Sequence, residues 1–167
     1  VINTVMFKYF NIFPFLTDLI IKISIGIIFF NFGYQKLIKL INNEGQDIII
    51  MVSNIIFFGS LPVLFSWALA LSEVIIIFFL IYGVFSFLPI ANLITKIAGI
   101  LCLVISVVIV YQHIFVWGDN IFLNGPFDFF NASEGNKSIF GQVLFIPISS
   151  YIIFNNRVDT SFLNDNK

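Results

Sequence analysis

Residues 63–85 read VLFSWALALSEVIIIFFLIYGVF and contain a single charged side chain, Glu73. At a rise of about 1.5 Å per residue, a helix of this length crosses the hydrocarbon core of a bilayer. No other charged residue occurs between Asp47 and Lys96. A carboxylate at this depth costs roughly 2.5–3.5 kcal/mol on insertion scales unless it is paired, protonated or hydrated. The stretch therefore predicts a membrane-spanning helix with an acid of functional importance inside it.

The composition of the whole chain agrees with a polytopic membrane protein. Of its 167 residues, 59% are hydrophobic and 10% are charged, whereas soluble domains have about 25% charged residues. Because a spanning chain must satisfy its backbone hydrogen bonds internally, we expect an all-α fold. The length predicts one transmembrane domain, residues 1–155, followed by a polar tail, residues 156–167.

Charge and the metal-binding residue types exclude several classes of function. The net charge is −1 and the lysines are scattered, which argues against a nucleic-acid partner. Cys102 is the only cysteine and His113 the only histidine. One histidine cannot form a bis-histidine haem site, so we expect neither haem nor another metal. The expected partners are the lipid bilayer and other proteins of a membrane complex.

Four apolar stretches are expected to span the membrane as a compact bundle. They are residues 15–33, 63–85, 97–116 and 138–154. A fifth apolar segment, residues 48–58, is too short to cross and is followed by Gly59 and Pro62, so we expect a helix along the interface. A fifth span is the alternative.

The basic residues favour an orientation with both termini in the cytoplasm. With four crossings the termini share one side of the membrane, which would hold Lys8, Arg157 and Lys167, together with Lys96 at the edge of a span. The opposite side would hold Lys36, Lys39 and Lys137. Because cytoplasmic loops carry an excess of basic residues, the sequence predicts a multi-pass protein of a cell membrane with its termini inside.

Small and polar residues recur at helical spacing and should face the inside of the bundle. On the first span one stripe contains Asp18, Lys22, Gly26, Phe29, Gly33 and Lys36. On the second span one face contains Ser66, Ala70, Glu73 and Leu80, and on the third Gly99, Ser106 and His113 recur every seven residues.

Two ion pairs can be expected from these positions. Asp18 and Lys22 are an i,i+4 acid–base pair. The long stem of Lys22 would also reach toward the middle of the bundle, where we expect it to pair with Glu73. In a chemical role, Glu73 would accept a proton and Lys22 would be its counter-charge. The alternative is a buried clamp that only fixes the register of the helices.

Three further residues from different spans should lie at the same membrane face. They are Lys36, His113 and Lys137. Together they would form a polar mouth that holds an anion or a quinone head group, with His113 able to exchange a proton near neutral pH. The alternative is three unrelated interfacial side chains, since lysines flanking a span commonly reach to the head groups.

Four short motifs resemble the DoxX family of four-span membrane proteins. The first is KISIGIIFFNFGYQKL, residues 22–37, a basic residue followed by a Gly-x-x-Lys ending. The second is SEVIIIFFLIYG, residues 72–83, one glutamate with a glycine ten positions later. The others are VVIVYQH, residues 107–113, and NKSIFG, residues 136–141. The resemblance covers about residues 18–148.

The resemblance implies a four-helix inner-membrane subunit linked to quinone-dependent sulfur redox, like the membrane subunit of a thiosulfate:quinone oxidoreductase. Glu73, Lys22 and His113 would be its chemical residues, with Lys36 and Lys137 at the quinone. The family usually has arginine where this chain has Lys22. Lysine cannot make the two parallel hydrogen bonds that an arginine makes with a carboxylate. A non-catalytic structural subunit of a larger membrane complex is the alternative.

Overall fold

The computed structural model describes residues 2–85, 87–117 and 140–154, and these are helical with connecting turns. The helices are α1 (Ile2–Ile41), α2 (Gln46–Ser53), α3 (Pro62–Val84), α4 (Ala91–Tyr111) and α5 (Phe140–Phe154). A π-helical turn, Gln112–Val116, continues α4. Within these ranges there is no strand, and the expected all-α class is confirmed.

Three of the described helices are long and apolar enough to cross a membrane. Their spanning parts are Phe13–Ile41, Pro62–Val84 and Ala91–Val116. The helix α5 has 15 residues, which at 1.5 Å per residue gives about 22 Å. It is apolar but shorter than the roughly 20 residues of a typical span.

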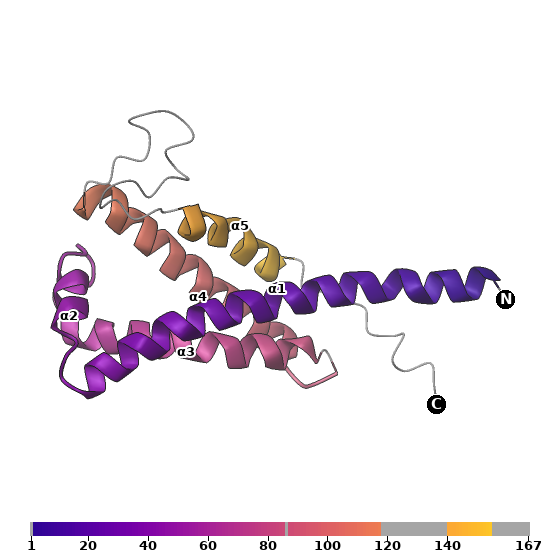
Figure 1. Ribbon diagram of the computed structural model, residues 1–167, viewed down its shortest axis with the longest axis horizontal. Coiled ribbons are helices and arrows are strands. Elements are labelled where there is room, and N and C mark those ends of the chain that lie inside the picture. Colours follow the sequence, from indigo (N-terminus) through magenta and orange to yellow (C-terminus); the bar gives the residue numbers. More distant parts are fainter. Residues whose placement is uncertain (1, 86, 118–139, 155–167) are drawn as a thin grey trace.

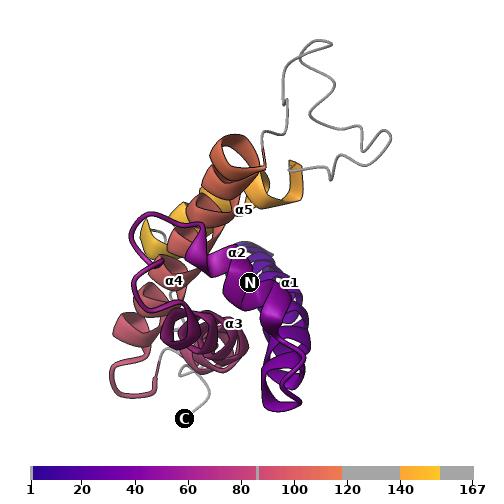
Figure 2. The same cartoon turned by 90° about the vertical axis from the view of Figure 1, so that its left-hand side faces the viewer.

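The helices run back and forth along one direction (Figure 1). Successive long helices α1, α3, α4 and α5 alternate in direction, and α2 lies at the end where α1 finishes and α3 begins. Figure 2 is viewed from that end, with α2 toward the viewer. The N-terminal part of α1 extends beyond the other helices.

Polar residues lie inside this arrangement and large apolar residues lie outside. The expected inward stripes are buried, among them Asp18, Ser66, Glu73 and Ser106. The outer faces expose large apolar side chains such as Phe78. Because water would penalise such surfaces, this distribution indicates contact with the lipid bilayer.

Several element boundaries differ from the expected ones, and the end of the first helix has an identifiable cause. The first helix continues to Ile41, because residues 34–41 keep the helical apolar pattern, and ends where Asn43 adopts a left-handed conformation with φ 61°. The Glu44 amide then donates to the Lys39 carbonyl at 2.8 Å, a common way to end a helix. The helix expected at residues 48–58 is α2, which begins at Gln46 and ends at Ser53.

Glycines set how closely the long helices approach one another. A Cβ atom added to Gly26 would lie 3.0 Å from Ile77 Cγ1, and one added to Gly33 would lie 2.6 Å from Glu73 Cβ. These two glycines therefore let α1 pack directly on the backbone of α3. At the other end of α3, Gly83 contacts Thr95 of α4 so closely that no Cβ would fit.

Candidate functional site

Lys36 and Glu73 form an ion pair between α1 and α3. Lys36 Nζ lies 2.5 Å from Glu73 Oε1. The Glu73 side chain is 1% exposed, whereas that of Lys36 is 20% exposed. The pair thus joins a fully buried carboxylate to a cation that still reaches the surface.

The two oxygens of Glu73 have different surroundings. Oε1 accepts the hydrogen bond from Lys36. Oε2 is buried, and no donor of the described residues reaches it. A carboxylate oxygen without a hydrogen bond inside a protein carries a desolvation penalty of about 1–3 kcal/mol. One oxygen of Glu73 therefore has a hydrogen-bond partner, and the other is available to accept a proton or a hydrogen bond.

The expected pairing of Glu73 with Lys22 is wrong, and the register of α1 on α3 explains why. Glu73 contacts α1 at Gly33. Lys22 is eleven residues from Gly33 and Lys36 only three, which correspond to about 16 Å and about 5 Å along the helix axis. The side chain of Lys22 cannot cover that distance. Its partner is Asp18, with Lys22 Nζ 2.7 Å from Oδ2 and both side chains buried, so the i,i+4 pair is confirmed.

A cavity of about 210 Å³ lies beside Lys36, between α1 and α2. Besides Lys36 it is lined by Phe32, Gln35, Lys39, Asp47, Ile48 and Met51. Lys39 Nζ lies 2.7 Å from Asp47 Oδ2 in an exposed pair. The hydrogen bond from Lys39 holds the pKa of Asp47 below its usual value, helped by the Ile48 amide. A polar opening therefore exists at the α2 end of the molecule.

The residues of this opening are only partly those expected from the sequence. Lys36 is among them, and Lys137 lies outside the described residues. His113 is buried, as the stripe it shares with Ser106 predicts, but it packs edge-on against Trp117 with ring centroids 4.6 Å apart. It does not line the cavity. The predicted cluster of three cations is thus not assembled by the described part of the chain.

His113 and its neighbour Gln112 are both buried in the π-helical turn. They are 2% and 1% exposed and continue the adjacent buried pair Ile105 and Ser106, which lies seven residues earlier. Gln112 Nε2 donates to the Met51 carbonyl at 3.0 Å. This bond ties the end of α4 to α2, next to the cavity.

Sequence reasoning missed three residues of this region: Lys39, Asp47 and Gln112. The turn Asn-Asn-Glu-Gly, residues 42–45, reverses the chain and brings Asp47 back to Lys39. The turn residues were the available signal for that pair. Gln112 lies seven residues after Ile105 and ten after Cys102, both buried, so helical spacing was the available signal for its burial.

Metal and thiol chemistry have little support in the part of the chain that the structure describes. No three His, Cys, Asp or Glu side chains there lie close enough together to hold a metal ion. Cys102 is a free, buried thiol in the apolar core.

Comparisons with known proteins return no similarity: no family model, no curated protein and no solved structure matches the chain.

Proposed function

We propose that this chain is a DoxX-like membrane subunit that crosses an inner or plasma membrane four times and works with partner proteins in quinone-linked redox. In this proposal Glu73 exchanges a proton with the quinone, and Lys36 is its counter-charge. A partner supplies the electrons, since reducing a quinone to a quinol takes two electrons and two protons.

One observation carries the proposal: Glu73 is a fully buried carboxylate with only one of its oxygens hydrogen-bonded. Ionisable residues within membranes are rare and are enriched at proton relays and substrate sites. A purely structural pair would be expected to have the remaining lone pairs satisfied. The open oxygen gives Glu73 a place for the proton that a quinone must gain or lose.

The position of Lys36 supports a connection to water. It contacts Glu73 on one side and lines the cavity at the α2 end on the other. A proton lost from Glu73 could be replaced from that cavity through a small displacement of the Lys36 ammonium. The exposed Lys39–Asp47 pair lies at the same opening.

The fourth crossing in the proposal is α5. It packs against α4, where a Cβ added to Gly99 would lie 2.8 Å from Ile153 Cγ1. Its direction is opposite to that of α4 (Figure 1). A helix of about 22 Å can cross if the bilayer thins locally or flanking residues reach the interface.

The test is binding of decylubiquinone to the purified chain in lipid nanodiscs. We expect saturable binding by the wild type and by Glu44→Gln, an exposed control. Glu73→Gln should bind at least about tenfold more weakly, the equivalent of about 1.4 kcal/mol. Absence of saturable binding to the wild type, or equal binding by the two variants, would refute the proposal.

A structural subunit is the second candidate, and the tight contact at Gly33 favours it. There the backbone of α1 meets Glu73 and Ala70, so the ion pair could serve to fix this register. On this reading Glu73→Gln, which keeps a hydrogen bond, would be tolerated much better than Glu73→Leu. Equal loss of function in both variants would instead indicate that the charge or proton of Glu73 matters.

A further inference from the structure

A second cavity lies between α3 and α4, on a different side of α3 from the Lys36–Glu73 pair. Its volume is about 230 Å³. The lining residues come from α2 and the turns after it, from α3 and from α4. They are Val52, Ile55, Phe58, Phe65, Ala68, Leu69, Ser72, Leu101, Val104, Ile105 and Val108.

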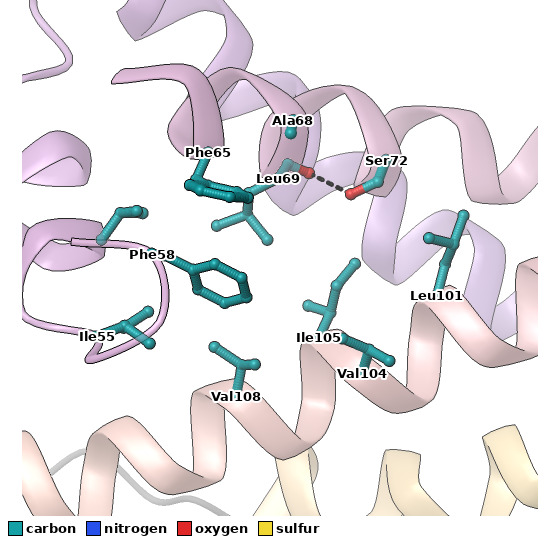
Figure 3. Close-up of a pocket in the computed structure, with 11 residues that line it drawn as sticks. Ile55, Phe58, Phe65, Ala68, Leu69, Ser72, Leu101, Val104, Ile105 and Val108 are labelled. Carbon is teal, nitrogen blue, oxygen red and sulfur yellow. Dashed lines mark hydrogen bonds between the residues drawn. The ribbon is translucent and has the colours of Figure 1, made fainter. Parts of the chain in front are cut away.

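The lining offers nothing to a polar ligand. Ser72 is its only side chain with a polar group, and the Ser72 hydroxyl donates to the Leu69 carbonyl at 2.8 Å. Figure 3 shows this bond at the edge of the cavity, with Phe58 pointing between Phe65 and Val108. Water needs two to four polar partners and would not be held here. A ligand of this cavity would therefore be apolar.

The fold explains why the cavity exists. Where α3 ends and α4 begins, Gly83 and Thr95 hold the two helices in contact. From there they diverge toward α2 (Figure 1). The turns after α2 fill only the far end of the gap, with Ile55 buried there and Phe58 and Phe65 in ring contact at 4.7 Å. An elongated apolar slot remains between these two ends.

The shape of the slot suits a linear chain. On α3 its lining residues run from Phe65 to Ser72 and on α4 from Leu101 to Val108. Seven residues of helix correspond to about 10 Å along the axis. The volume exceeds the roughly 150 Å³ of an apolar protein cavity that is known to bind benzene. Several methylene groups of one chain would fit.

The surroundings identify the source of that chain. Val104 lines the slot and is half exposed, and next to it on α4 Val107 is also half exposed without lining the slot. The slot therefore opens onto the apolar outer face of the helices, which faces lipid. Phospholipid acyl chains are the hydrocarbon that a bilayer presents to such an opening.

We propose that the slot between α3 and α4 binds one acyl chain of a membrane phospholipid. The occupant would restore the dispersion contacts that the empty lining lacks. It would also keep the diverging ends of α3 and α4 at a fixed separation. This inference does not depend on the role of Glu73.

The test uses a phosphatidylcholine with a diazirine on its acyl chain, in nanodiscs of unlabelled phosphatidylcholine. After illumination, labelled positions are mapped by mass spectrometry. The α4 residues that line the slot, Leu101, Val104, Ile105 and Val108, should be labelled about fivefold more than the lipid-facing Phe78 region, the ratio equivalent to about 1 kcal/mol. Because labelled and unlabelled phosphatidylcholine compete equally for the slot, this excess should stay constant as the labelled fraction rises.

A matched pair of variants separates the slot from the surrounding lipid. Val108→Phe adds a ring to the slot, and Val107→Phe adds the same ring to the exposed neighbouring position. Only Val108→Phe should lose the excess labelling of the slot. The wild-type excess is informative even if Val108→Phe cannot be purified.

Three results would overturn the proposal. The first is labelling of the slot-lining residues of α4 that is no stronger than at Phe78, and the second is equal loss in both variants. The third is loss of the excess labelling when a prenylated quinone replaces a small part of the unlabelled phosphatidylcholine. That last result would assign the slot to a quinone tail, whereas failed quinone binding with excess lipid labelling of the slot would refute only the proposed function.

Discussion

At the scale of single residues, the account rests on the different burial of the ion pairs that Lys36 and Lys39 form. The first is bonded to a buried carboxylate and the second to an exposed one. Exposed pairs contribute about 0–1 kcal/mol, whereas removing one partner of a buried pair costs about 3–5 kcal/mol because a buried charge loses its counter-charge. Two lysines three residues apart should therefore respond very differently to the same substitution.

We expect Lys36→Met to destabilise the protein by about 3 kcal/mol and Lys39→Met by less than about 1 kcal/mol. The measurement is the free energy of unfolding in mixed micelles. The double variant Lys36→Met/Glu73→Leu should be more stable than Lys36→Met alone, because no unpaired charge remains inside. Equal effects of the two single substitutions would show that the Lys36–Glu73 pair is not buried.

The exposed pair gives a prediction for pH. Because Lys39 lowers the pKa of Asp47 below 3.8 in the folded protein, the stabilisation is fully present above that value and is lost as the pH falls through the lowered pKa. For an exposed pair it amounts to less than about 1 kcal/mol. NMR titration of the Asp47 carboxyl should show the lowered pKa, and Lys39→Met should return it toward 3.8. An unchanged titration would contradict the pairing.

At the scale of the helices, the close approach of α1 and α3 depends on two glycines. The free space around their Cα atoms is not the same. A Cβ at Gly33 would lie 2.6 Å from Glu73 Cβ and 2.9 Å from the Ala70 carbonyl oxygen. One at Gly26 would meet Ile77 Cγ1 at 3.0 Å. Because backbone cannot move aside as a side chain can, Gly33 is the more restricted position.

We therefore expect Gly33→Ala to cost about 1–3 kcal/mol, the usual range for overpacking, and Gly26→Ala to cost less. Thermal unfolding of both variants in the same detergent would measure this. Gly33→Ala should also loosen the Lys36–Glu73 pair, so quinone binding should fall with it. A larger effect at Gly26 would mean that the helices cross elsewhere.

The sequence predicted the helices and their inward faces better than the contacts between them. Glu73 could be placed near the middle of its helix because its apolar flanks set its depth. Which lysine reaches it depends on the register of α1 against α3, and spacing within one helix holds no information about register. The burial of Gln112 follows from its spacing to Ile105, but its bond to Met51 depends on how α2 lies against α4, which spacing within one helix likewise cannot reveal.

At the scale of the whole molecule, the two ends of the helices differ in how tightly they are packed. At one end, Gly83 and Thr95 pack α3 tightly against α4. At the other, α2 is bonded to α4 through Gln112 and Met51, and both described cavities lie near it. Access to the Lys36–Glu73 pair is therefore expected from the α2 end only.

The central claim is that the Lys36–Glu73 pair is reached from the α2 side of the membrane. This claim combines the membrane topology with the position of the site. It can be measured by the reaction of single cysteines with a membrane-impermeant thiol reagent in sealed vesicles, in a Cys102→Ser background. The cysteines would replace Lys36 in the cavity, Glu44 in the turn before α2, and Phe87 in the turn between α3 and α4. We predict that Lys36→Cys and Glu44→Cys react from one side and Phe87→Cys from the other. Reaction of Lys36→Cys from the Phe87 side, or of Glu44→Cys and Phe87→Cys from the same side, would contradict the account.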